Sequence, residues 1–240
     1  MRASISISIS ISISIACAAL WACGGAPPPR APEGVPQEAA PVVKRPAMKV
    51  RGELGSVDPD RVKAAFSALD DQFMACQKKG LDRVELISGN VKFFLRIGED
   101  GAAKWAYLEG SDLGDQETEQ CLIDLVLGAR WPKPDGGEAE ARYSMDLPMQ
   151  ATRPPTDWSA DKVSAALAKH GEALDKCKAG SNARFSATMY VGHGGKVLAA
   201  GVPAGGKDRQ DQADCLAHAI EKLKGLPSPG SWPAKVSFDL

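Results

Sequence analysis

Cysteine is the residue whose number and spacing say most about chemistry in this chain of 240 residues. Two of the six cysteines lie near the N-terminus, and the other four are spread over the rest of the chain. They are Cys17, Cys23, Cys76, Cys121, Cys177 and Cys215. A cysteine thiol can carry a lipid, hold a metal ion or form a disulfide, and the choice depends on the compartment and on the elements that carry the residue.

Cys23 follows a segment typical of an export signal. After Arg2, residues 3–22 carry no charge and begin with an alternation of Ser and Ile. The sequence Leu20-Trp21-Ala22-Cys23 resembles a lipobox, in which a small residue precedes a cysteine that receives a diacylglycerol, although Trp21 departs from that pattern. We expect a signal peptide over residues 1–22 and lipid attachment at Cys23, which would give a stable membrane anchor. Lipidation at Cys17 and cleavage without a lipid are the alternatives.

A proline-rich segment follows the expected lipidation site. Seven prolines lie between residues 24 and 56, and apolar residues show almost no periodicity there. Such a composition buries too little apolar surface to offset the entropy of an ordered chain. We therefore expect residues 23–56 to be a lipidated N-terminus and a disordered tether. Gly24 differs from the Asp that retains lipoproteins at the inner membrane of enteric bacteria. By this analogy the expected location is the outer membrane, facing the periplasm.

Two segments of the remaining chain repeat one pattern. We expect a first domain over residues 57–147, a linker over 148–156 and a second domain over 157–240. At an offset of 101 residues, helix-spaced apolar positions of one segment coincide with those of the other. Val62, Phe66, Leu69, Phe73 and Cys76 fall on Val163, Leu167, His170, Leu174 and Cys177. Asp58 is the predicted N-cap of the first of these helices, and Ser159 that of the second.

The rest of each segment also has the same order of elements. An alternating strand, a glycine turn and a second strand precede another amphipathic helix, a Pro-x-Pro breaker and a closing strand. Twenty residues separate Gly101 from Cys121, and twenty separate Gly195 from Cys215. This predicts the α+β class, with two tandem small domains of order α-β-β-α-β. Each would have a three-stranded antiparallel sheet covered by two disulfide-linked helices, and the linker predicts separate cores.

The repeat also selects a pairing of the cysteines. Each predicted helix carries one of the four cysteines that remain after lipidation, and an even number in an oxidising compartment favours disulfides. Four cysteines permit three connectivities, of which the repeat favours Cys76–Cys121 and Cys177–Cys215. The alternatives are buried free thiols or a zinc site, although the C-x-x-C pairs usual in zinc sites are absent. We expect no metal.

Other polar residues do not form a recognisable catalytic set. His170, His193 and His218 are scattered, and none has a carboxylate or cysteine partner that recurs in the other segment. We therefore expect no enzyme activity and no cofactor. Four acidic residues are predicted to start a helix, where negative charge suits the helix dipole, and to be solvated. They are Asp112, Asp115, Glu117 and Glu119.

Aromatic residues of the first segment suggest a surface for a partner. Trp105 and Tyr107 lie on one predicted strand, and Trp131 lies beyond the next helix. Together they can form an exposed aromatic patch. The alternative is that they cover the sheet edge and the disulfide. Ala199 and Gly201 stand at the first two positions in the second segment, so this surface would belong to the first domain alone.

The stretch from residue 101 to residue 147 resembles the TonB C-terminal-like domain, in the cysteine-containing variant of AgmX/PglI-type proteins of gliding myxobacteria. The resemblance rests on Ser111-Asp112-Leu113-Gly114-Asp115, on Cys121-Leu122 and on Trp131-Pro132-Lys133-Pro134-Asp135-Gly136-Gly137. The second segment keeps the cysteine and the Pro-x-Pro but lacks the Ser-x-Leu-Gly-Asp element. The resemblance implies a periplasmic module that contacts other proteins, often by adding a strand to a partner. A lipidated N-terminus argues against energy transduction.

These features together predict a non-catalytic cell-envelope lipoprotein that acts as a periplasmic protein-interaction or scaffold module. Its expected partner is an envelope protein or a cell-wall component, and its expected contact with the membrane is the lipid anchor only. A formal net charge of −1 provides no long-range field to attract nucleic acid, so no nucleic-acid partner is expected. The alternatives are a carrier of a small apolar ligand or an envelope enzyme.

Overall fold

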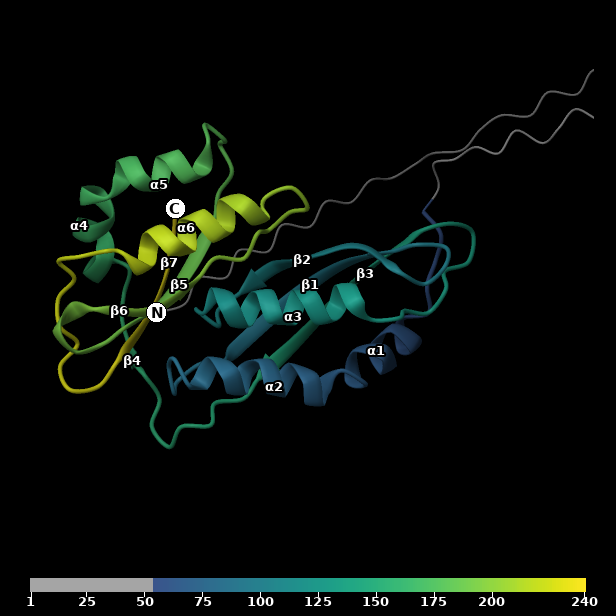
Figure 1. The fold of residues 1–240 in the computed structure, drawn as a ribbon, viewed down its shortest axis with the longest axis horizontal. Coiled ribbons are helices and arrows are strands. Elements are labelled where there is room, and N and C mark those ends of the chain that lie inside the picture. The colour runs from purple at the N-terminus through teal and green to yellow at the C-terminus, as the bar shows by residue number, and fades with distance from the viewer. Residues whose placement is uncertain (1–53) are drawn as a thin grey trace, which may run out of the picture. The chain divides into compact units, whose positions relative to one another are not determined.

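The computed structural model describes residues 54–240. Cys23, the signal peptide and nearly all of the proline-rich segment lie outside the described residues. The described part has the mixed α+β class that the sequence predicts, and we distinguish a first half, residues 54–147, from a second half, residues 156–240 (Figure 1). No helix in residues 54–240 has the length and apolar character needed to cross a membrane.

The first half is a three-stranded antiparallel sheet with helices on one face. Its elements are α1 (Pro59–Ser67), α2 (Asp70–Leu81), β1 (Gly89–Ile97), β2 (Ala103–Ser111), α3 (Gln116–Gly128) and β3 (Ala139–Leu147). β1 lies between β2 and β3, and α2 and α3 lie over the same side of the sheet (Figure 1). Alternate side chains of β1 point towards these helices, so Val91, Phe93 and Leu95 are fully buried.

The second half has a sheet of four strands. Its elements are β4 (Thr156–Asp157), α4 (Asp161–Lys169), α5 (Gly171–Lys178), β5 (Ser186–Val191), the short 3₁₀ helix η1 (His193–Gly195), β6 (Val197–Gly201), α6 (Gln210–Glu221) and β7 (Ala234–Asp239). The strand order is β4-β7-β5-β6, so the three antiparallel strands follow the order of the first sheet. The fourth strand was not predicted. Thr156, the last residue of the expected linker, pairs in parallel with β7.

The first helix predicted in each half is divided into two. α1 ends at Ser67 and α2 begins at Asp70, whereas α4 and α5 meet at His170. Two acidic residues at the start of α2 suit a new helix N-terminus, and Gly171 has a low helix propensity at the second break. The apolar periodicity continues across both breaks, which is why the sequence predicted one helix in each case.

One of the two predicted helix caps is confirmed. The Asp58 carboxylate accepts a hydrogen bond from the Asp60 amide at 2.9 Å. The prediction for Ser159 is wrong, because Ala160 occupies the N-cap of α4 and no side chain caps that helix. The carbonyl of Ser159 instead accepts a hydrogen bond from the Lys162 amide at 3.1 Å. In the first turn of α4, the Ser164 hydroxyl also donates a hydrogen bond to the Asp161 carbonyl at 2.9 Å.

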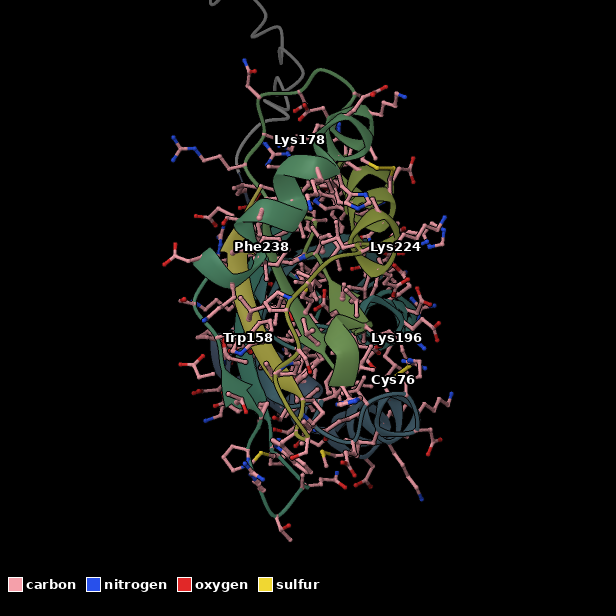
Figure 2. All side chains as sticks on the ribbon, turned by 90° about the vertical axis from the view of Figure 1, so that its left-hand side faces the viewer. Cys76, Trp158, Lys178, Lys196, Lys224 and Phe238 are labelled. Atoms are coloured by element: carbon pink, nitrogen blue, oxygen red, sulfur yellow. A yellow bond between two sulfur atoms is a disulfide. The ribbon has the colours of Figure 1, made fainter. Side chains whose placement is uncertain are left out.

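The predicted cysteine pairs are confirmed. Cys76 on α2 is bonded to Cys121 on α3, with 5.8 Å between their Cα atoms. Cys177 on α5 is bonded to Cys215 on α6, with 5.4 Å between their Cα atoms. Figure 2 draws the disulfides in yellow. Each bond joins the two helices that cover the same sheet.

The two halves fill the space between sheet and helices differently. In the first half, Phe66 lies between the rings of Tyr143 and Trp131, with ring centroids 4.2 and 4.6 Å away. Phe73 and Phe93 continue this aromatic cluster. The second core contains mostly aliphatic and small side chains, among them Val163, Ala166, Leu174, Ala187, Met189, Val191, Leu216 and Ile220.

The expected separation of the two cores is incomplete. Each half has its own cluster of buried apolar residues, yet Tyr190 and Ala199 of the second half pack into the cluster of the first. The Tyr190 hydroxyl also donates a hydrogen bond to the Leu86 carbonyl at 3.0 Å. We call this contact region the seam. It joins β5, β6 and residues 202–205 of the second half to residues 84–90 and 108–119 of the first.

Candidate interaction surface

One face of the first sheet points away from its helices. Phe94 and Arg96 occupy the alternate positions of β1 that do not enter the core. The strand register places Tyr107 opposite Phe94 and Trp105 opposite Arg96 on β2, and it places Arg142 opposite Phe94 on β3. These five side chains therefore share one surface. We call it the sheet face.

The side chains of the sheet face are stacked. The rings of Phe94 and Tyr107 are parallel within 14°, with their centroids 4.8 Å apart. The Arg142 guanidinium lies 4.8 Å from the centroid of Phe94, and that of Arg96 lies 5.6 Å from the centroid of Trp105. Both distances suit a cation–π interaction. The surface is thus a layer of aromatic rings with two guanidinium groups stacked on it.

Carboxylates hold the two guanidinium groups in place. Arg96 contacts Glu138 at 2.9 Å and Glu140 at 3.0 Å, both from the strand region of β3. Arg142 contacts Glu109 on β2 at 2.9 Å, while 60% of its side chain remains exposed. Exposed ion pairs of this kind contribute little to stability. Their effect is to orient arginine side chains that would otherwise be free to move in solvent.

The structure brings together two of the three aromatic residues predicted to form a partner surface. Trp105 and Tyr107 belong to the sheet face, but Trp131 does not, because it is buried in the core of the first half against Phe66. Its indole nitrogen donates a hydrogen bond to the Val126 carbonyl at 3.0 Å. The Trp131 amide bonds to the carbonyl of Gly101, which fixes the chain after α3 against the turn between β1 and β2. The prediction for Trp131 is therefore corrected to a core residue.

The second half covers the β2 side of the sheet face. The Lys207 ammonium lies 4.2 Å from the centroid of Trp105, and Tyr107 packs against the core of the second half. At the strand edge, the Gly205 amide donates a hydrogen bond to the Leu108 carbonyl at 2.9 Å. The accessible part of the sheet face is consequently its β3 side.

The outer side of β3 is paired with no other strand within residues 54–240. The nearest backbone contact precedes the strand, where the Gly55 amide donates to the Glu138 carbonyl at 2.8 Å. In the second half, β4 occupies the outer side of β7, and the Trp158 amide donates to the Lys235 carbonyl at 3.0 Å. A strand edge without a partner presents backbone donors and acceptors to another chain. The first half therefore offers an open nine-residue edge, whereas β4 closes part of the equivalent edge in the second half.

The acidic start of α3 departs from its prediction. Glu117 is solvated, with 76% of its side chain exposed, but Asp115 and Glu119 are each only 3% exposed. The Arg83 guanidinium donates from Nε to Asp115 Oδ1 at 3.0 Å. Glu119 is covered because β6 approaches closely at Gly201, where a Cβ atom would lie 2.4 Å from Glu119 Oε1. A helix N-terminus expected to be in solvent is thus part of the seam.

The three histidines remain apart in the structure. His170 lies at the break between α4 and α5. His193 Nδ1 lies 3.1 Å from the Gly230 carbonyl, and His218 Nδ1 lies 3.7 Å from a Glu221 oxygen. Residues 54–240 contain no group of three or more His, Cys, Asp or Glu side chains placed to hold a metal ion.

Sequence reasoning did not identify Phe94, Arg96 or Arg142 as members of the sheet face. The available signal was the strict alternation of β1, in which Phe94 stands at a position otherwise filled by charged side chains. An aromatic residue on the polar side of a strand indicates that the second face of the sheet is also covered or used. Arg142 carries no such signal, because an arginine on an edge strand is ordinary.

Comparison of the chain with protein-family models, with curated proteins and with solved structures gives no match. The resemblance of residues 101–147 to the TonB C-terminal-like domain therefore stays a prediction that rests on the motif residues themselves.

Proposed function

We propose that this protein is a non-catalytic, lipid-anchored protein of the cell envelope whose first half binds an extended segment of a partner protein. The observation that carries the proposal is the open outer edge of β3 beside the accessible part of the sheet face. A strand added to β3 would gain backbone hydrogen bonds along the edge, while alternate side chains would contact Arg142, which covers the buried ring of Phe94. Arginine and aromatic side chains are enriched among residues that dominate binding.

We infer that the two halves arose by tandem duplication of one domain, in the boundaries 57–147 and 157–240. The shared order of the antiparallel strands and the equivalent disulfides support this inference. The two halves differ at the outer edge strand and at the exposed face of the sheet. The second half has β4 on the outer side of β7. The positions that correspond to the sheet face hold no arginine, and their one aromatic side chain, Tyr190, is buried in the seam. Strand addition is thus assigned to the first half.

The alternative functions have less support. A carrier of an apolar ligand needs a cavity between sheet and helices, and in the first half that space is filled by Phe66, Phe73, Phe93 and Trp131. An enzyme needs a nucleophile or base beside an orienting group, and the dispersed histidines do not supply one.

Photocrosslinking at the β3 edge tests the proposed binding site. A photoreactive amino acid placed at Ser144 in the full chain should crosslink to the partner in intact cells, because this exposed position lies on β3. Asp239 is the matched control, because it is also exposed and occupies the equivalent position on β7. Mass spectrometry of the products should map an extended partner segment beside Ser144 and little product at Asp239. Equal crosslinking at both positions would contradict the assignment to the first half.

Lipid attachment has a separate test. In the Cys23→Ala variant the protein should move from the membrane fraction to the soluble fraction, because each buried methylene of an acyl chain contributes roughly 0.8 kcal/mol to membrane binding. Cys17→Ala is the matched control and should leave the protein in the membrane fraction. Mass spectrometry of the mature N-terminus should find the acyl chains on Cys23. Release by Cys17→Ala alone would move the site to that residue.

A further inference from the structure

The seam contains a buried carboxyl group that lacks a full set of partners. Glu119 Oε1 accepts a hydrogen bond from the Ser111 hydroxyl at 2.8 Å, whereas Oε2 has no partner in residues 54–240. The side chain also lines a cavity of about 10 Å³ between α3 and the second half, with Val202 and Gln210 among its walls. Such a cavity has room for one water molecule at most. A buried carboxylate with an unsatisfied oxygen is unfavourable, whereas the neutral acid is tolerated.

The charges around Glu119 on its own helix and the preceding loop also favour the neutral acid. Burial raises the pKa of Glu119 from 4.5 to about 8, and the negative charges of Asp115 and Asp112 add to this effect, against the Ser111 hydrogen bond. Ion pairs of Glu119 with a cationic side chain are absent from the described part of the chain. The carboxyl is therefore protonated at neutral pH.

The cations near the seam have other partners. Arg83, which follows α2, binds Asp115 and Glu117 rather than Glu119. Lys235 on β7 donates to the Ser88 carbonyl at 2.8 Å, and burial lowers the pKa of this lysine, although Asp112 and Glu119 act in the opposite direction. On β5, the hydroxyl of Tyr190 is bonded to Leu86, and burial raises its pKa. None of these groups forms an ion pair with Glu119 in the closed seam.

We propose that the seam is a proton-controlled joint between the two halves, closed while the Glu119 carboxyl is protonated and loosened when it loses its proton. Close contact makes the joint sensitive to this single group. A Cβ atom at Gly201 would lie 2.4 Å from Glu119 Oε1 and 2.9 Å from the Asp115 amide nitrogen, so the seam has little spare room there for a hydration shell. An ionised Glu119 can gain its missing hydrogen bonds from water only if β6 moves away.

The direction of the pH effect follows from the linkage between proton binding and closure. The closed seam holds its proton up to a pH of about 8, whereas a solvated Glu119 loses it near 4.5. Between these values the closed state binds more protons than the open state, so closure weakens as the pH rises. The equilibrium changes by up to about tenfold per pH unit across this window and levels off above it. Closure is strongest at acidic pH.

Hydrogen exchange of amides that bridge the seam measures the joint in the full chain. The Val202 amide donates to the Gln116 side-chain oxygen at 2.8 Å, and the Gly205 amide donates to the Leu108 carbonyl. Their protection factors, corrected for the intrinsic pH dependence of exchange, should fall at least tenfold between pH 6 and 8. In Glu119→Gln, which mimics the neutral acid, protection should stay high and independent of pH. Glu117→Gln is the matched control on the same helix and should behave as the unmodified protein.

A second measurement keeps the proposal testable if Glu119→Gln does not fold. The side-chain carboxyl carbon of Glu119, followed by NMR in the unmodified protein, should titrate near pH 8, together with the loss of protection. Titration near 4.5 would overturn the proposal. So would a fall in protection that persists unchanged in Glu119→Gln, because another group would then control the seam.

Discussion

Replacing both members of either cysteine pair by serine should lower the free energy of unfolding by about 4 kcal/mol in the entropic account, within the usual range of 2–5 kcal/mol for a small exported domain. The two bonds join residues 45 and 38 positions apart, so the loops they close are nearly equal. The entropic contribution depends on the logarithm of loop length, and the two double variants should therefore lose nearly the same stability. Urea unfolding of Cys76→Ser/Cys121→Ser and of Cys177→Ser/Cys215→Ser measures the losses.

The location of each loss distinguishes two accounts of the fold. With separate cores, removing one bond would leave the other half unaffected. Because Tyr190 and Ala199 pack into the first core, we expect loss of the second bond to reduce hydrogen-exchange protection near Leu86 as well. If hydrogen-exchange protection in the first half does not change, the contacts across the seam do not contribute to the stability of the first half. Peptide mapping without reductant should recover only the two bonds within the halves.

Gly114→Ala should destabilise the protein by about 3 kcal/mol. Gly114 has a φ of +73°, a conformation that costs an L-residue about 1–2 kcal/mol. A Cβ atom there would also lie 2.9 Å from Thr188 Cγ2 and 3.2 Å from Tyr190 Cε2, across the seam. Overpacking of this kind typically costs about 1–3 kcal/mol more.

Gly180→Ala separates the two causes. Gly180 has the same φ of +73°, but a Cβ atom there would meet no other atom within 4 Å. Its substitution should cost only the conformational part, about 1–2 kcal/mol. The difference between the two variants in thermal or urea unfolding therefore reports the seam contact. An equal loss of unfolding free energy in the two variants would show that the approach of Thr188 to Gly114 contributes nothing to stability.

Sequence patterns predicted the parts of the fold that depend on local periodicity and on the repeat. The alternation from Val91 to Ile97 indicated a strand, and the matched positions of Cys76 and Cys177 indicated equivalent helices. The breaks before α2 and α5 were missed because the helical periodicity of apolar residues continues across them. Strand β4 was missed because two residues carry no period that could be recognised.

The features that depend on contact between the halves could not be predicted. Asp115 and Glu119 have the composition of a solvated helix start, but Arg83 covers the Asp115 carboxylate and the approach of Gly201 from the second half covers Glu119. The sequence left open whether Trp131 lies at a partner surface or covers the sheet edge, because nothing local shows that the chain after α3 returns to the turn at Gly101. Trp105 and Tyr107 were correctly grouped, since they share a strand and a face.

If the two halves are duplicates, the close approach at Gly201 means that their order along the chain cannot be exchanged. The residue of the first half that corresponds to Gly201 in sequence is Tyr107, whose ring could not fit against Glu119. A chain built from two first halves would therefore fail to dock, and a third copy added after the second would find no matching acidic turn, because Lys207-Asp208-Arg209 stands there. Solenoid repeats can be gained or lost one unit at a time. On the proposed duplication, this pair would instead be an ordered unit, and changes at Gly201 and at Glu119 are expected to occur together.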